Sequence, residues 1–300
     1  MPLPSTANVL VTGANAQLAS ALRQRLSAVC AVTALDRQGL DVTRPSDVSR
    51  VLSQTRPDVI INCAAFNDVD GAERQATAAV AVNGLAVGSL AREAATTGAV
   101  LVHYSTDFVF DPAEDPGPLP ESAAVRPRSV YAQSKLLGEL YARQAPRHYI
   151  LRVASLFGGT PAKSSIDSMA ARLRRGDTVR AFDDRTVSPS YVHDVADATA
   201  RLLAAEVPYG LYHCVNSGHG TWHGVAVALA VALGRDPAAS VTAVPFASVP
   251  LVAVRPRFAA LSNAALAGHG VTLPHWRDAI ARYARALLDG ADATPPVSAP

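Results

Sequence analysis

The fold of this chain is constrained most by its first segment. There, a short apolar run ends in a glycine turn and leads into a helix-like stretch. Residues 8–11 are the apolar run, Gly13 follows them, and residues 17–26 have the spacing of an amphipathic helix. This order predicts a strand that turns sharply into a helix, because strands and helices repeat their apolar positions differently. The pattern recurs along the first half of the chain. We expect further strands at 32–35, 59–62, 100–104 and 148–153, separated by helices at 45–54, 76–97 and 129–143.

The predicted strands are apolar throughout, rather than alternately polar and apolar. Strands of this kind are buried on both faces, which is typical of a parallel sheet with helices on both sides. The sequence therefore predicts an α/β fold with a Rossmann-type, doubly wound parallel sheet over residues 1–152.

Beyond residue 152 the alternation is less regular, which predicts a smaller α/β substrate lobe over 153–290. Segments near 187–214 are expected to return to the first domain, so that the two parts interleave. Residues 291–300 are of low complexity, and we expect them to be disordered. Over this second part of the chain we expect helices at 166–175, 192–205, 221–233 and 276–288, with strands at 179–182, 210–215 and 241–244.

Three further features lie in this lobe or in the segment that leads into it. Trp222 and Trp276 are interpreted as packing residues of the lobe. The proline-rich segment 112–127 either borders the substrate cleft or is a plain connector. His219 and His223 are four apart, but no nearby acid completes a ligand set, so we expect no metal site.

Composition excludes several classes of protein. A net charge of +2 with 17% charged residues argues against a nucleic-acid partner. No apolar run approaches the roughly 18 residues of a membrane span, and the N-terminus lacks a signal peptide. We therefore expect a soluble cytoplasmic protein, with both a monomer and a homodimer compatible with the sequence. The cysteines show neither disulfide nor metal-ligand spacing: Cys30, Cys63 and Cys214.

The turn after the first strand has the context of a dinucleotide-binding site. Gly13 would form the tight turn, and the amides at the following helix N-terminus would receive a pyrophosphate. Alanines stand where the fingerprint has further glycines, and Ala16 puts a methyl where the backbone approaches phosphate. The residues expected to contact the dinucleotide here are Gly13, Asn15, Ala16, Gln17 and Leu18.

The segment after the second strand bears on the choice of cofactor. An acidic residue there holds the ribose hydroxyls of NAD, whereas a basic residue suits the 2′-phosphate of NADP. Asp36 and Arg37 offer both, and Asp41 is a candidate contact for the adenine region. Each is also explained as a solvated loop charge. Arg37 favours NADPH as the predicted cofactor, with NADH as the alternative.

Tyr131 and Lys135 are four apart at the start of a predicted helix, so their side chains face the same way. A free phenol has a pKa near ~10, and a nearby ammonium favours the phenolate. Tyr131 would then give a proton to a carbonyl oxygen as hydride arrives at its carbon. The strand at 100–104 leads into Thr106, or Ser105 as the alternative, whose hydroxyl would orient that carbonyl. Taken alone, the pair is also explained as an exposed helical pair.

Several motifs together carry a resemblance to a known family. They are NCAAFNDVDGAE, HYSTDFVFD, VYAQSKLLGE, SPSYVHDVAD, GLYHCVNSGHGTWH and VRPRFAALSN, in this order along nearly the whole chain. The sequence resembles the dTDP-4-dehydrorhamnose reductase family of extended short-chain dehydrogenases/reductases. The resemblance implies reduction of the C4 ketone of a nucleotide-linked, dTDP-type 4-keto-6-deoxyhexose by NAD(P)H, with Tyr131 as proton donor.

The resemblance also implies site residues by motif position. The catalytic set would be Thr106, Tyr131 and Lys135. Arg255 would approach the nucleotide diphosphate, although a surface arginine explains it as well. The cofactor groove would be lined by Asn62, Ala64, Ala65 and Asn83, and the sugar by Ser105, Asp107, Phe108 and Val109.

The chain departs from the family in the phosphate loop, where Ala16 replaces the usual middle glycine, and at two further positions, and this leaves alternatives open. Phe108 stands where members usually have tyrosine, and Leu156 where they commonly have an aromatic residue. A missing hydrogen-bonding group changes the discrimination between sugars. A 4-ketoreductase for another deoxysugar of secondary metabolism is therefore an alternative. Others are a regulatory dinucleotide-binding protein like the methionine adenosyltransferase β subunit, and an NAD-dependent nucleotide-sugar epimerase.

Overall fold

The computed structural model describes residues 7–112, 117–205 and 207–290. The tail expected to be disordered, 291–300, and part of the proline-rich segment 112–127 lie outside the described residues. In the described part, no helix is long and apolar enough to cross a membrane.

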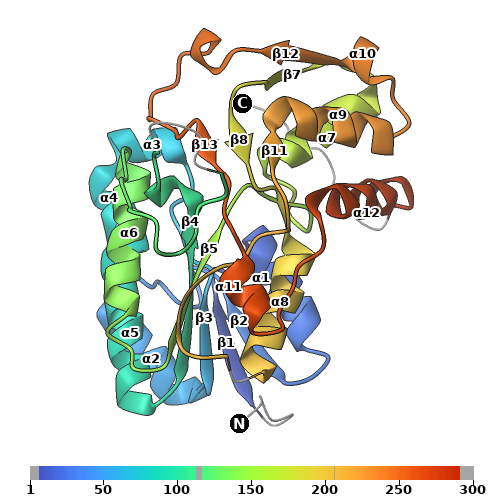
Figure 1. Cartoon of the computed structure of the whole chain (residues 1–300). Coiled ribbons are helices and arrows are strands. Elements are labelled where there is room, and N and C mark those ends of the chain that lie inside the picture. Colours follow the sequence, from blue (N-terminus) through green and yellow to red (C-terminus); the bar gives the residue numbers. More distant parts are fainter. Residues whose placement is uncertain (1–6, 113–116, 206, 291–300) are drawn as a thin grey trace.

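The core of the molecule is a six-stranded parallel sheet in the order β10-β5-β4-β3-β1-β2 (Figure 1). The chain passes from β1 to β2 on one side and then crosses to β3 on the other, so the sheet has its switch point between β1 and β3. A crevice at the carboxyl ends of these strands is the usual ligand site of such sheets. The strands are β1 (Asn8–Thr12), β2 (Ala31–Leu35), β3 (Val59–Asn62), β4 (Val100–Thr106), β5 (His148–Val153) and β10 (Gly210–His213).

Helices cover both faces of this sheet, as Figure 1 shows. Neighbouring residues of β1 explain the two layers, because Leu10 belongs to the apolar cluster on one face and Val11 to the cluster on the other. The predicted Rossmann-type α/β fold is confirmed. One layer holds α2 (Pro45–Thr55), α5 (Ala86–Thr97) and α6 (Val130–Ala142), and the other holds α1 (Gln17–Leu26), α8 (Val192–Ala204) and α11 (Ala264–Gly268).

The single helix predicted over 76–97 is wrong in detail. Helices α3 (Val69–Arg74) and α4 (Ala76–Val80) come first, and a π-helical turn over Ala81–Leu85 then joins α4 to α5. Asn83 in this turn is fully buried, and a Cβ on Gly138 of α6 would lie 2.2 Å from the Asn83 carbonyl oxygen. The π turn therefore lies where the two helices approach too closely for a side chain. Periodicity does not reveal such a turn.

A second lobe lies above the carboxyl ends of the strands (Figure 1). Its core includes Trp276 and Tyr283, which are almost fully buried. Its helices are α7 (Ser165–Arg175), α9 (Trp222–Ala232), α10 (Pro237–Ser240) and α12 (Trp276–Leu288). Its strand pairs are β7 (Val179–Phe182) with β12 (Val241–Val244), β6 (Leu156–Phe157) with β9 (Ser190–Tyr191), and β8 (Thr186–Val187) with β11 (Gly220–Thr221) and β13 (Phe258–Ala259).

Candidate active site

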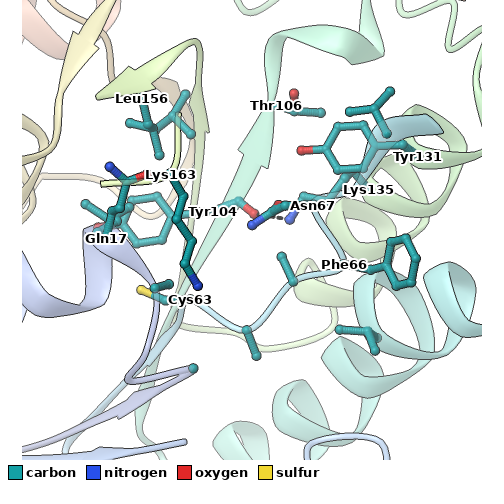
Figure 2. Close-up of a pocket in the computed structure, with 18 of the residues that line it drawn as sticks. Gln17, Cys63, Phe66, Asn67, Tyr104, Thr106, Tyr131, Lys135, Leu156 and Lys163 are labelled. Carbon is teal, nitrogen blue, oxygen red and sulfur yellow. Dashed lines mark hydrogen bonds between the residues drawn. The ribbon is translucent and has the colours of Figure 1, made fainter. Parts of the chain in front are cut away.

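A cavity of about 830 Å³ lies at the carboxyl ends of β1, β3 and β4, between the sheet and the second lobe. It brings together most of the predicted site residues, although they come from segments far apart in the sequence. Figure 2 shows the phenol of Tyr131 in this cavity, with Thr106 beside it and Lys163 reaching in from the opposite side. The predicted residues that line it are Gly13, Asn15, Ala16, Gln17, Leu18, Asp36, Arg37, Asp41, Asn62, Ala64, Ala65, Ser105, Thr106, Asp107, Phe108, Tyr131, Lys135 and Arg255.

Two predicted residues do not line the cavity, and both predictions need correction. Asn83 is buried in the π turn, where its side chain accepts from the Phe66 amide at 2.8 Å and donates to the Phe66 carbonyl at 3.1 Å. It supports the loop that carries Phe66 instead of contacting the cavity. Val109 is the last residue of a 3₁₀ turn over Asp107–Val109, which points successive side chains in different directions. Phe108 therefore faces the cavity, while Val109 is buried in an apolar cluster.

The Gly13 turn packs closely against the backbone that follows β3. Gly13 has a φ of 67°, and a Cβ there would lie 2.7 Å from the Ala64 amide nitrogen. Only glycine fits such a position. Ala16 has an ordinary extended conformation at the N-cap of α1, so its methyl causes no backbone strain. No described side chain caps this helix N-terminus, and its amides are left for an anion.

The far end of the cavity has the features of an adenosine site. Asp36 accepts from the amides of Gly39 and Gln38 and from the side chain of Asn15. These hydrogen bonds, that of Gly39 first, hold the pKa of Asp36 below its usual value. Beside it, Arg37 and Arg44 lie 3.6 and 3.7 Å from Asp41, around a smaller hollow. Both guanidinium groups are largely exposed and available to a phosphate.

Tyr131 and Lys135 occupy the first turns of α6, whose N-terminus is capped by Ser129. Lys135 is buried, and its ammonium donates to the Tyr104 carbonyl oxygen at 2.5 Å. Burial lowers the pKa of Lys135 to about 8, with Glu139 acting in the opposite direction. Burial raises the pKa of Tyr131 to about 12, and the hydrogen-bonded Thr106 hydroxyl partly offsets this rise. The phenol is therefore protonated at neutral pH, and the lowering of its pKa by Lys135 that the sequence led us to expect is not found in this structure.

The two candidate hydroxyls at the end of β4 have different partners. Ser105 donates to Glu139 at 2.6 Å, and Glu139 also accepts two hydrogen bonds from Arg152 at 2.8 and 2.7 Å. The Ser105 hydroxyl is thus engaged behind the cavity. Thr106 donates to Asp107 at 3.0 Å beside the phenol. Of the two hydroxyls, that of Thr106 lies beside the phenol, and it can meet a substrate carbonyl by turning its O–H away from Asp107.

Asp107 is a buried acid next to this hydroxyl. Its Oδ1 accepts from Thr106, while its Oδ2 has no hydrogen-bond partner among the described residues. Burial raises the pKa of Asp107 to about 6, and Arg185 opposes that rise. The carboxyl is therefore a polar group with one side free for a ligand.

Arg255 enters the cavity from the second lobe but is not free. Asp70 of α3 accepts from its two terminal nitrogens at 3.0 and 2.8 Å, and also from the Ala253 amide. This bidentate pair connects the Rossmann half to the second lobe. It lowers the pKa of Asp70 to about 2, chiefly through the Arg255 hydrogen bonds.

The comparisons with known proteins place the chain in a family. The RmlD substrate binding domain family matches residues 7–288. The chain belongs to this family. It is 34% identical to the dTDP-4-dehydrorhamnose reductase of Burkholderia thailandensis, over 93% of this chain and 99% of that protein. The resemblance to dTDP-4-dehydrorhamnose reductases stated above is thereby confirmed.

One further relative and one solved structure agree with this assignment. The chain is 35% identical to a probable dTDP-4,6-dihydroxy-2-methyloxan-3-one 4-ketoreductase of Streptomyces antibioticus, over 90% of this chain and 92% of that protein. Its fold is similar to the crystal structure of dTDP-4-dehydrorhamnose reductase from Bacillus anthracis in complex with NADP. For that pair the TM-score is 0.87 at 27% identity, over 93% of this chain and 98% of the other.

Several residues of the site were not predicted from the sequence. Arg44 lies near Arg37 and was detectable as a second basic residue in the same loop. Trp222, predicted only to pack, also lines the cavity. Arg185 and Lys163 reach the cavity from the second lobe, and no sequence motif signalled either. Among the described residues, no group of His, Cys, Asp and Glu is arranged to hold a metal ion.

Proposed function

We propose that this protein is an oxidoreductase that reduces the C4 ketone of a nucleotide-linked 4-keto-6-deoxyhexose with NADPH. The observation that carries the proposal is the meeting of Thr106, Tyr131 and Lys135 in one cavity with the Gly13 turn. The names of the relatives, dTDP-4-dehydrorhamnose reductases and a 4-ketoreductase, support the same chemistry.

The residues of the Rossmann half fit a nicotinamide dinucleotide. The Gly13 turn and the N-terminus of α1 would hold the pyrophosphate, because no described side chain caps the amides at this N-terminus. Asp36 would bind the ribose. Arg37 and Arg44 favour NADPH over NADH, since both are available to a 2′-phosphate. When bound, the cofactor supplies the hydride.

The catalytic residues then supply the proton to the ketone oxygen. Tyr131 is neutral at physiological pH because of its raised pKa, and it donates its proton to the carbonyl oxygen that becomes the alcohol. The Thr106 hydroxyl would position that oxygen by turning its O–H from Asp107 to the substrate. The Lys135 ammonium, fixed by the Tyr104 carbonyl one helical turn from Tyr131, would stabilise the phenolate left on Tyr131 until solvent returns a proton. One hydride and one proton together convert the ketone to the alcohol.

The sugar would lie against Asp107, Phe108 and Leu156. The Phe108 ring stands edge-on to the Tyr131 ring at 5.7 Å between centroids, so an apolar ring borders the reacting carbon. Leu156 adds a second apolar surface. Members of the family usually carry tyrosine and another aromatic residue at these positions. The substitutions favour a deoxysugar with fewer hydroxyl groups, of the kind used in secondary metabolism. Nucleotide sugars are made in the cytoplasm, and we place the protein there.

The proposal is tested by following NADPH oxidation with dTDP-4-keto-6-deoxyglucose and its 3,5-epimer in turn. We expect turnover that depends on Tyr131, a preference for NADPH over NADH, and loss of that preference in Arg37→Ala. Cofactor that stays oxidised and bound after one turnover would instead indicate an epimerase. Cofactor binding without turnover of any deoxysugar would indicate a regulatory subunit.

A further inference from the structure

Arg185 is a buried arginine on the second-lobe wall of the cavity. It is only 6% exposed, and its Nε donates to the Pro256 carbonyl at 3.0 Å. Its guanidinium lies 5.6 Å from the ring centre of Phe108, 5.8 Å from that of Trp222 and 5.5 Å from that of Phe246. Aromatic faces attract a guanidinium and hold its plane in place. Arg185 is therefore a fixed cation.

The charge of Arg185 is not matched by a neighbouring carboxylate. Among the residues that the structure describes, no acid forms an ion pair with it. The buried Arg152, by contrast, is paired with Glu139, and Arg255 with Asp70. Asp107 acts on Arg185 only at a distance, with one oxygen engaged by Thr106. A buried cation is costly unless a counter-ion compensates for its lost hydration.

The surroundings indicate which counter-ion Arg185 would take. Phe108 contacts both the Arg185 guanidinium and the Tyr131 ring, so Arg185 lies one aromatic ring away from the proton donor. Trp222 borders the same cavity, and its indole N–H is buried without a partner among the described residues. A fixed cation and an unused N–H next to a sugar pocket suit an oxyanion. The anionic group nearest to the sugar in a nucleotide sugar is the phosphate attached to it.

We infer that Arg185, assisted by the Trp222 indole N–H, binds the sugar-linked phosphate of the substrate. Arg255, which the family resemblance pointed to, is already neutralised by Asp70 and serves mainly to tie the second lobe to α3. The inference rests on the proposed function and deepens it, because it assigns the recognition of the diphosphate to a particular pair of residues.

Binding of dTDP and dTMP to the NADP⁺-loaded enzyme, measured by calorimetry, tests the inference. The two probes differ by the β-phosphate, so the ratio of their affinities reports its recognition. Wild type is expected to prefer dTDP, and Arg185→Met, which keeps the apolar stem, is expected to reduce that preference by about 10- to 100-fold. Trp222→Phe, which keeps a ring but loses the N–H, is expected to reduce it by a smaller factor.

A matched control is Arg257→Met, which removes an exposed arginine paired with Asp184 and is expected to leave the ratio unchanged. Equal weakening of dTDP and dTMP in Arg185→Met would mean that Arg185 only supports the lobe, and would overturn the inference. If Arg185→Met does not fold, Arg185→Gln gives the same readout, because it also removes the charge while keeping a polar side chain, and an unchanged ratio there overturns the inference too. Normal turnover by wild type alongside either result leaves the proposed function standing. Failure of wild type to bind dTDP or to turn over a dTDP-sugar contradicts both the inference and the proposed function.

Discussion

The two walls of the cavity are built differently. On the Rossmann wall, the groups next to the reaction and the ribose are already engaged with the backbone, as in Lys135 with the Tyr104 carbonyl and Asp36 with its own turn. On the second-lobe wall, Arg185 has no ion-pair partner among the described residues, and Lys163 extends into the cavity. The difference indicates that the two walls have different roles. The Rossmann wall is preorganised for the chemical step, while the second-lobe wall carries positive charge for an anionic ligand.

The largest effect is expected for Tyr131→Phe, which removes the proton donor from the Rossmann wall. We expect kcat to fall by about 10²- to 10⁴-fold, because no other group replaces the acid. The affinity for NADP⁺ is expected to stay near that of wild type, since the ring remains. Steady-state kinetics and calorimetry together check this. An unchanged kcat would show that a group other than Tyr131 donates the proton. The distinction between the two walls would then lose its basis.

A pair of substitutions tests the phosphate turn. In Gly13→Ala, the new Cβ would lie 2.7 Å from the Ala64 nitrogen at a φ of 67°, which costs roughly 1–3 kcal/mol. We expect cofactor affinity and thermal stability to fall together. Ala16→Gly is the matched change at a position without strain, and it is expected to leave stability within about 1 kcal/mol. Equal losses in the two variants would show that the close approach at Gly13 is not what shapes this site.

Asp107 sits between the two walls, and its raised pKa gives a pH-dependent test. Its folded pKa of about 6 exceeds the unfolded value near ~3.9, so the folded state favours the protonated acid. The resulting penalty is absent below pH ~4, grows as the pH rises through about 6, and is complete above it. Asp107→Asn should therefore stabilise the protein by roughly 2–3 kcal/mol at pH 8 and hardly at all at pH 4. Denaturant unfolding at both pH values measures this. Destabilisation at pH 8 would show that Asp107 is the true counter-ion of Arg185.

The smallest effect is expected for the Asp70–Arg255 ion pair, which connects the two walls. The pKa of Asp70 is lowered to about 2, so the pair with Arg255 stabilises the fold above pH ~4 and is lost as the pH falls toward about 2. Asp70→Asn should cost only about 1 kcal/mol at pH 7, because the Asp70 side chain is 32% exposed and water screens the pair. Asp184→Asn, which breaks the more exposed pair with Arg257, is the control and should cost less. Thermal melts of the two variants at pH 7 decide the order.

The sequence predicted the Rossmann wall well because its signals are local. A glycine turn, a strand end and a tyrosine–lysine pair each have a short pattern, and parallel pairing brings the strand ends to one edge. The second-lobe wall depends instead on long-range packing. Arg185 reaches the cavity because Phe108, Trp222 and Phe246 enclose it, and no spacing in the sequence encodes that arrangement. For the same reason, the burial of Val109 and the π turn around Asn83 were missed.

The central claim is that this cavity transfers hydride to a sugar ketone with Tyr131 as the acid. The most direct test uses NADPH deuterated at the transferring position, with a dTDP-4-keto-6-deoxyhexose, and mass spectrometry of the sugar product. We predict that wild type places one deuterium on C4 of the sugar and that Tyr131→Phe forms this product at a strongly reduced rate. A reduced sugar without deuterium, or its formation at an undiminished rate in Tyr131→Phe, would contradict the account.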